Sequence, residues 1–143
     1  MSKRQRKLNE TFLDSYIILD KICCHKFGVS TGGTTAYINR LISTKFAPGR
    51  DEVLQRLVKY RSIRNRFAHE SGALENMDEI SKPDIKWLEK FKKSIERNRD
   101  PYSIYLKKAR KLTRRRKVKK VITVIFILLL IAAAVAAYFI LGK

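Results

Sequence analysis

The stretch from Val121 to Leu141 constrains the fold of this chain more than any other feature. It contains 21 residues, none of them charged and none of them proline. A helix of this length rises about 31 Å at 1.5 Å per residue, which matches the hydrocarbon core of a bilayer. The alternative is a buried core helix, but residues that are apolar on every side need more surrounding protein than a chain of 143 residues provides. The sequence therefore predicts a single transmembrane helix over residues 121–141.

Positive charge is concentrated directly before this segment. The chain has a formal net charge of +19, and residues 107–143 hold 11 basic side chains and no acidic one. Nearly all of them lie in a polybasic juxtamembrane linker over residues 107–120, whereas only Gly142 and Lys143 follow the apolar stretch. Since basic residues stay on the cytoplasmic side, the sequence predicts a single-pass membrane protein with a cytoplasmic N-terminal domain and a translocated C-terminus.

The basic linker also predicts a partner. Lysines and arginines clustered beside a transmembrane helix attract anionic headgroups, at about 1 kcal/mol for each charge. We therefore expect anionic membrane lipids to contact the six basic residues nearest the bilayer, which are Arg114, Arg115, Arg116, Lys117, Lys119 and Lys120. A nucleic-acid-binding arm is the alternative, and the same charges could serve both ligands.

Residues 1–106 have the pattern of a small helical bundle. Apolar side chains recur at spacings of three and four residues in the segments 8–27, 37–42, 51–69 and 81–95, and residues 102–112 can form a last short helix. Gly32 and Gly33 predict a turn or hinge after the first helix. No segment shows the alternation of a half-buried strand, so the predicted class is all-α, with a four- to five-helix bundle followed by the transmembrane helix.

The cysteines predict neither a disulfide framework nor a metal site. Cys23 and Cys24 are the only two in the chain and are adjacent in sequence. A metal site at Cys23-Cys24-His25 lacks a fourth ligand. A domain of about 105 residues can bury a helical core without disulfides or bound metals. We therefore expect no cofactor and no metal, and a reducing compartment.

The segment from Arg61 to His69 predicts a functional site, because it places an arginine on an apolar helix face. At 100° per residue, one stripe of the helix consists of Val53, Leu57, Tyr60, Arg64, Phe67 and Ala68. A buried guanidinium in this stripe is costly unless a carboxylate pairs with it or the stripe opens into a cleft. Asp14 and Asp20, on the first predicted helix, are the candidate carboxylates.

A polar ridge accompanies this stripe. Arg61, Asn65 and His69 are spaced by four residues, and Leu54 and Val58 lie on the same side of the helix. A core stripe with an adjoining mixed face suits a helix that also meets a second copy of the same chain. The sequence therefore predicts a homodimer.

The hexapeptide Arg64-Asn65-Arg66-Phe67-Ala68-His69 resembles the signature of the HEPN superfamily. Members are small helical bundles in which a histidine follows an arginine after four to six residues, frequently with a polar residue directly after the arginine. The preceding Tyr60-Arg61-Ser62-Ile63 and the following Glu70 fit the same style. The resemblance covers about residues 8–106 and leaves the membrane segment outside.

The resemblance implies a metal-independent endoribonuclease whose active cleft forms between two protomers. It implies Arg64 as the phosphate clamp, His69 as general acid or base toward the ribose 2′-hydroxyl, and Asn65 as the residue that orients them. Arginine and histidine suit these tasks, because a guanidinium holds phosphate oxygens and an imidazole exchanges protons near neutral pH. On an ideal helix Arg64 and His69 point about 140° apart, so we expect a second subunit or a helix irregularity to bring them together.

The leading prediction is thus a membrane-anchored HEPN-type endoribonuclease that acts on RNA, as a toxin or an antiviral effector, with an antitoxin or regulatory protein as a further partner. The alternative is a non-catalytic, membrane-anchored HEPN adaptor that dimerises and binds a partner without cutting RNA. A purely structural reading also remains, in which Arg64 pairs with a carboxylate and His69 interacts with the C-terminus of its own helix.

Overall fold

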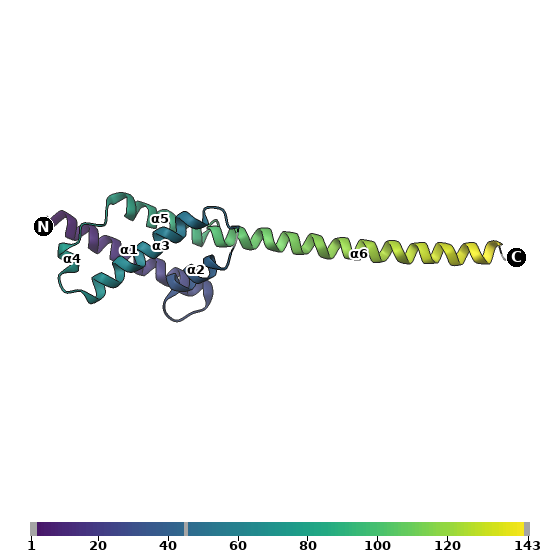
Figure 1. Ribbon diagram of the computed structural model, residues 1–143, viewed down its shortest axis with the longest axis horizontal. Coiled ribbons are helices and arrows are strands. Elements are labelled where there is room, and N and C mark those ends of the chain that lie inside the picture. Colours follow the sequence, from purple (N-terminus) through teal and green to yellow (C-terminus); the bar gives the residue numbers. More distant parts are fainter. Residues whose placement is uncertain (1–2, 45, 142–143) are drawn as a thin grey trace. The chain divides into compact units, whose positions relative to one another are not determined.

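The computed structural model describes residues 3–44 and 46–141, and their regular structure is helical throughout, without a strand. The prediction of an all-α chain is confirmed. The chain divides into two compact units, residues 1–105 and 106–143. The first unit is a bundle of packed helices and the second is the greater part of one long helix (Figure 1).

Six helices follow one another along the described residues. Their bounds are α1 (Lys3–Phe27), α2 (Gly33–Ile42), α3 (Arg50–His69), α4 (Ala73–Asn76), α5 (Lys82–Glu96) and α6 (Pro101–Leu141). The periodicity located the four main bundle helices, but α1 begins five residues earlier than the apolar pattern predicts, because its first turns are polar and exposed. The short α4 was not predicted, since four residues carry no periodic signal.

The core of the bundle forms around α1. Phe12, Tyr16, Leu19 and Cys23 are buried along one face of this helix, at the predicted spacing of three and four residues. Aromatic rings from other helices meet this face, and the ring centroids of Phe12 and Tyr60 are 5.4 Å apart in an edge-on arrangement. Figure 1 shows α4 beside the N-terminal half of α1 and α2 beside its C-terminal half.

Side-chain hydrogen bonds fix the segments between the helices. The buried Asn9 of α1 donates to the carbonyl oxygens of Leu74 and Met77, at 2.9 and 2.8 Å. At the start of α5, Ser81 and Asp84 form a capping box and Pro83 occupies the first turn, as the sequence predicts for a helix beginning there. The hydrogen bonds of Asn9 and the capping box both provide partners for backbone groups that have none within the helix at its ends.

Gly33 lies where α2 crosses α1, and a side chain there has no space. A Cβ atom at this position would overlap the carbonyl oxygen of Asp20 and the backbone nitrogen of Cys24. Gly33 is also the first residue of α2 rather than part of a hinge, so the sequence-based interpretation of the glycine pair is wrong for this residue. Its role is close backbone approach.

A buried cluster holds the first turn of α6 within the bundle. The fully buried carboxylate of Asp100 accepts hydrogen bonds from Lys26 Nζ at 2.7 Å and from the Tyr37 hydroxyl at 2.9 Å. It also accepts a hydrogen bond from the backbone N–H of Ser103 and caps the helix. Burial on its own would raise the pKa of Asp100, but the hydrogen bonds from Lys26 and Ser103 outweigh it and lower this pKa. The half-buried Lys26 and the buried Asp100 therefore form an ion pair that joins α1 to the residue directly before α6.

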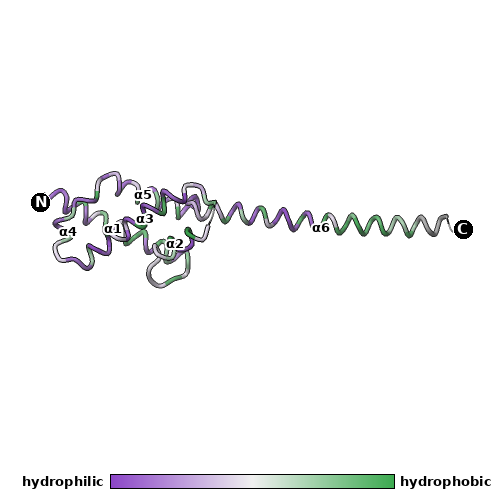
Figure 2. Tube along the Cα trace, in the orientation of Figure 1, coloured by the Kyte–Doolittle hydropathy of each residue, from purple (hydrophilic) through white to green (hydrophobic). Residues whose placement is uncertain are grey.

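One helix among the described residues is long and apolar enough to cross a membrane, and its apolar window is not buried. Figure 2 shows hydrophilic residues in the first part of α6 and hydrophobic residues in the part beyond it. The predicted short helix over 102–112 and the linker over 107–120 are both parts of α6, because nothing between Pro101 and Leu141 interrupts the helix. Gly142 and Lys143 lie outside the described residues.

The substitution Gly33→Ala should destabilise the bundle strongly, because the added methyl group meets backbone rather than a movable side chain. We expect a loss of about 3 kcal/mol, at the upper end for overpacking. This corresponds to a decrease of roughly 10 °C or more in the thermal midpoint of a domain of this size. The midpoint can be followed by the fluorescence of Trp87, the single tryptophan, in the full-length protein in detergent.

Gly49→Ala provides the control, because Gly49 also lies at the start of a helix but a Cβ there meets no atom within 4 Å. Its φ of +70° predicts a smaller cost, about 1 kcal/mol. Equal midpoints for the two variants would contradict the packing role assigned to Gly33.

Candidate functional site

A cavity of about 560 Å³ opens between α1, the loop that precedes α2, and α3. Its lining consists of Tyr16, Ile17, Asp20, Lys21 and Cys24 from α1, Ser30, Thr31, Gly32 and Thr35 from the segment around the start of α2, and Arg61, Arg64 and Asn65 from α3. Three of these residues are cations and one is an acid. The cavity is therefore a basic site with hydroxyl groups along one wall.

The α3 stripe opens into this cavity at Arg64. Leu57, Tyr60 and Ile63 are buried in the core, whereas Arg64 is half-buried and reaches the cavity. Its Nη1 lies 3.3 Å from Oδ1 of Asn65, the neighbouring residue. Of the two arrangements that could accommodate an arginine in the stripe, the structure has the cleft.

Neither candidate carboxylate pairs with Arg64. Within the part of the chain that the structure describes, Arg61 and Arg64 form no ion pair. Asp20 lines the same cavity, but its Oδ1 accepts a hydrogen bond of 2.7 Å from the backbone N–H of Thr34. The structural reading of Arg64 as half of an Asp14 or Asp20 pair is therefore wrong, and the guanidinium is available to a ligand.

The start of α2 adds to the positive character of the cavity. N–H groups at the N-terminus of a helix carry a partial positive charge and commonly hold anions. Gly32 and Thr35 at this end of α2 both line the cavity. Tyr16 of α1 also lines the cavity, and burial raises the pKa of its hydroxyl, so this group stays protonated at physiological pH. Both α1 and the start of α2 therefore contribute hydrogen-bond donors to the cavity.

His69 is placed apart from this cavity. It lies in the last turn of α3, is exposed, and is not among the lining residues. It forms no hydrogen bond or ion pair with the described residues. Asn65 connects the two places, because it lines the cavity and is also on the exposed face that α3 shares with Ser62 and His69. The structure thus joins Arg64 to Asn65 and leaves His69 on a neighbouring surface.

Arg66, the middle arginine of the motif, has a different environment. It donates to Glu79 Oε1 at 2.5 Å and lies 3.6 Å from the carboxylate of Glu70. These two carboxylates raise the pKa of Arg66. Arg66 therefore helps to fix the segment after α3, and it differs from Arg64 in having acidic partners.

Sequence reasoning did not find the α1 and loop side of the cavity. Lys21, Ser30 and Thr31 line it, but they are ordinary polar residues in sequence, and only the packing of α1, α2 and α3 brings them near Arg64. Cys23 is buried in the core, and burial raises the pKa of its thiol to about 12. No group of three or more metal-ligating side chains is assembled among the described residues.

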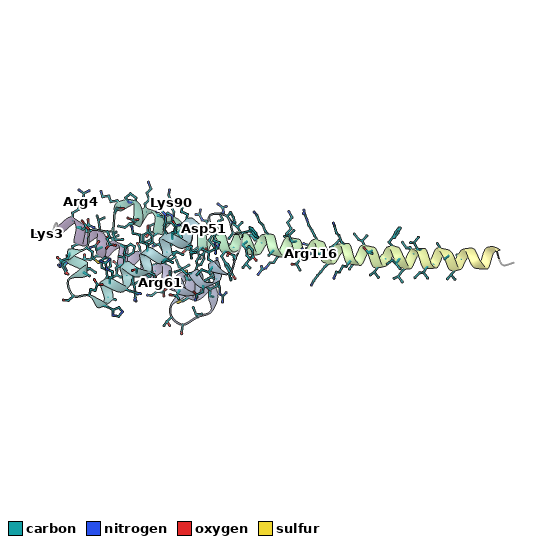
Figure 3. The ribbon with its side chains drawn as sticks, in the orientation of Figure 1. Lys3, Arg4, Asp51, Arg61, Lys90 and Arg116 are labelled. Carbon is teal, nitrogen blue, oxygen red and sulfur yellow. The ribbon has the colours of Figure 1, made fainter. Side chains whose placement is uncertain are left out.

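The six predicted lipid contacts lie on α6. Arg114, Arg115, Arg116, Lys117, Lys119 and Lys120 are all exposed there. Figure 3 shows Arg116 on the part of α6 before the apolar segment.

Comparison with known proteins places the chain in a sequence family. The family described as "Family of unknown function (DUF6548)" matches residues 10–125, which include most of the bundle and the basic part of α6. The chain belongs to this family. No curated protein and no solved structure matches it. The description of the DUF6548 family assigns no activity, so the HEPN resemblance stays a prediction.

The cavity geometry predicts that a small polyanion will stabilise the protein through Arg64. Pyrophosphate at ten times its dissociation constant should add about 1.4 kcal/mol to the free energy of unfolding. We expect the thermal midpoint to rise with pyrophosphate in the wild type and in Arg66→Gln, and to rise much less in Arg64→Gln. Both variants remove one arginine charge from the same helix, so an equal response in the two would show that the anion does not use this cavity.

Proposed function

We propose that this protein is a membrane-anchored, metal-independent endoribonuclease of the HEPN type that acts as a homodimer. The observation that carries the proposal is the position of Arg64, a half-buried arginine without a carboxylate partner among the described residues, at a basic cavity. A structural arginine would have the acidic neighbours that Arg66 has. An arginine that binds a phosphate group would have no such acidic neighbours, because they would compete with the phosphate for the guanidinium.

The proposed reaction uses only groups of the protein and the RNA. Arg64, with Arg61 and Lys21 beside it, holds the scissile phosphate and offsets the negative charge that builds on its oxygens. The ribose 2′-oxygen attacks the adjacent phosphorus and loses its proton to a base, while the bond to the 5′-oxygen breaks and the leaving oxygen receives a proton. His69 is assigned to this proton transfer, and the products are a 2′,3′-cyclic phosphate and a 5′-hydroxyl.

Two copies of the chain are needed for this chemistry. Arg64 and His69 are five positions apart on α3, so they point about 140° apart on a regular helix. The cavity of one subunit contains Arg64 and Asn65 but not His69. We assign the missing imidazole to the second subunit, whose His69 would enter across a symmetric interface.

Exposed apolar side chains support an interface at this place. Ile17 lines the cavity and is 40% exposed, and Ile18 beside it is 48% exposed. Val58 is 42% exposed on the side of α3 that carries Ser62 and Asn65. Each of these side chains would lose contact with water if a second α3 packed against the motif, which is favourable.

We assign the apolar part of α6 to the bilayer and the basic part before it to the inner membrane surface. No acidic residue of α6 offsets the basic side chains of residues 107–120. These charges favour the cytoplasmic face and attract anionic lipids. Anchoring would keep the nuclease domain on the side of the membrane where RNA is present.

One observation favours the alternative function of a binding adaptor. His69 lies outside the cavity of its own subunit, so a single bundle has an anion site without a base. If dimers do not bring His69 to the cavity of the partner subunit, the protein would bind polyanions without cutting them.

Cleavage of single-stranded RNA by the full-length protein in nanodiscs, in the presence of a chelator, tests the proposal. We expect cleavage by the wild type and a decrease of at least about 100-fold in His69→Ala, as for loss of a general acid or base. Arg64→Ala should cause a similar decrease through loss of charge stabilisation. Product analysis should give cyclic phosphate ends.

His25→Ala is the matched control, because His25 is the only other histidine and does not line the cavity. It should cleave at the rate of the wild type. A purified wild-type dimer that leaves RNA intact would contradict the nuclease and support the adaptor.

A further inference from the structure

One face of α5 carries positive charge only. Its residues recur at spacings of three and four and fall within about 80° of one another around the helix axis. They are Lys82, Lys86, Lys90, Lys93 and Arg97, which we call the α5 stripe. All five are exposed, and none forms an ion pair with a described residue.

The acidic residues of α5 do not neutralise this stripe. Asp84 accepts hydrogen bonds from Ser81 and Tyr60 at the start of the helix. Glu89 borders the stripe, where it accepts a hydrogen bond from Ser15 and pairs with the buried Lys92, and the nearby charge of Lys93 helps to lower its pKa. Glu96 lines a separate hollow next to α1. An ordinary solvated helix face mixes both signs of charge evenly, whereas here five cations have one carboxylate, Glu89, at their edge.

The stripe borders a groove of about 510 Å³ between α3 and α5. Arg56, Lys82, Pro83, Lys86, Trp87 and Lys90 line it, and none of these residues is acidic. Trp87 forms the recessed wall, because it is half-buried and stacks on Phe91 with the ring centroids 4.8 Å apart. The guanidinium carbon of Arg56 lies 5.3 Å from the centroid of the Trp87 ring, and its Nε lies 3.3 Å from Oε1 of Glu52.

We propose that the α5 stripe and its groove bind the phosphate backbone of single-stranded RNA, at a second contact apart from the cavity. The proposal rests on the proposed nuclease function for its choice of RNA. Figure 3 shows Lys90 and Arg61 on opposite edges of the bundle. A strand bound along α5 would therefore leave the cavity open for the segment to be cut.

The spacing and chemistry of the stripe suit a strand. Lysines four residues apart on a helix are separated by about 6 Å along its axis, which is close to the distance between successive phosphates of an extended strand. An ammonium group on a flexible stem binds phosphate without a fixed geometry, so it contributes affinity and not sequence preference. The guanidinium plane of Arg56, which lies over the ring of Trp87, offers a surface on which a base can stack beside that ring.

The shape of the groove favours a strand over a bilayer. A tryptophan that inserts into the lipid interface must project beyond the cations around it, but Trp87 lies between Arg56 and Phe91 and is half-buried. A flexible polyanion can enter such a recess, whereas the plane of the headgroups cannot. The stripe is thus assigned to nucleic acid.

Binding of an uncleavable oligonucleotide separates this proposal from the nuclease proposal. The probe is a 2′-O-methyl oligouridine, which lacks the attacking hydroxyl, and the protein is the full-length chain in phosphatidylcholine nanodiscs. We expect the probe to change the fluorescence of Trp87, the single tryptophan. Lys86→Gln/Lys90→Gln should bind about tenfold more weakly at 150 mM salt, with a salt slope reduced by about 1.4 for two lost phosphate contacts.

Lys3→Gln/Lys7→Gln is the matched control, because it removes two exposed lysines four residues apart on α1, outside the groove. Its affinity and salt slope should equal those of the wild type. Equal loss in both double variants, or a Trp87 signal that does not change at saturation, would overturn the proposal. Quenching of Trp87 by brominated anionic lipid, with no response to the oligonucleotide, would assign the stripe to the membrane instead.

The outcome does not depend on cleavage. A bundle that binds the probe through α5 but leaves RNA intact would support the stripe and contradict the nuclease. Cleavage of RNA by Lys86→Gln/Lys90→Gln at the wild-type rate and affinity would support the nuclease and contradict the stripe.

Discussion

The close approach of α2 to α1 at Gly33 is the contact on which the rest of the bundle depends. Without a Cβ at this position, the first turn of α2 lies directly on the backbone of Asp20 and Cys24. Asp20 can then cap α2 through the N–H of Thr34. The same crossing brings the start of α2 to the wall of the cavity and carries Tyr37 to Asp100 at the beginning of α6. One absent methyl group therefore positions both the basic cavity and the base of the long helix.

In the bundle, several acidic side chains form hydrogen bonds that stabilise the fold, whereas several basic side chains have no acidic partner among the described residues. Asp100, Asp84 and Glu89 are each held by hydrogen bonds within the core or at a helix end, and these bonds lower their pKa values despite the opposing effect of burial. The arginines of the cavity and the lysines of the α5 stripe have no such partners among the described residues. Their positive charge is left for a ligand, and both sets lie beside a concave surface. The two surfaces differ in chemistry, since guanidinium groups fix a phosphate in one orientation and ammonium groups do not.

Sequence periodicity predicted much of the fold because the bundle helices are amphipathic and their caps are local. The capping residues Ser81 and Asp84 and the apolar spacing in α1 need no information from distant residues. Gly33 could not be interpreted in this way, because a glycine in a turn and a glycine at a helix crossing look alike in sequence. The continuous α6 was also not predicted, because nothing in the basic segment after the predicted short helix over residues 102–112 indicates whether that segment is helical or extended.

The candidate site was predicted in part for a similar reason. Arg64 was identified because an arginine in an apolar stripe conflicts with burial, and such a conflict is visible in sequence. The other walls of the cavity come from residues more than 25 positions away, and the α5 stripe becomes distinct from a solvated face only when its missing acidic partners are known. The separation of Arg64 from His69 follows from helical geometry. The proposed active site therefore needs Arg64 from one chain and His69 from a second chain.

Mixing two inactive variants tests that claim most directly. Arg64→Ala keeps His69 and His69→Ala keeps Arg64, so a dimer of one copy of each contains one complete site only if the two residues act across the interface. The two variants are paired at random, either by unfolding and refolding them together or by co-expression. Half of the dimers should then be mixed, and each mixed dimer has one intact site of two. We therefore expect about a quarter of the wild-type cleavage activity in the presence of a chelator. Activity that stays at the level of the separate variants, while cross-linking shows that mixed dimers have formed, would contradict a shared site.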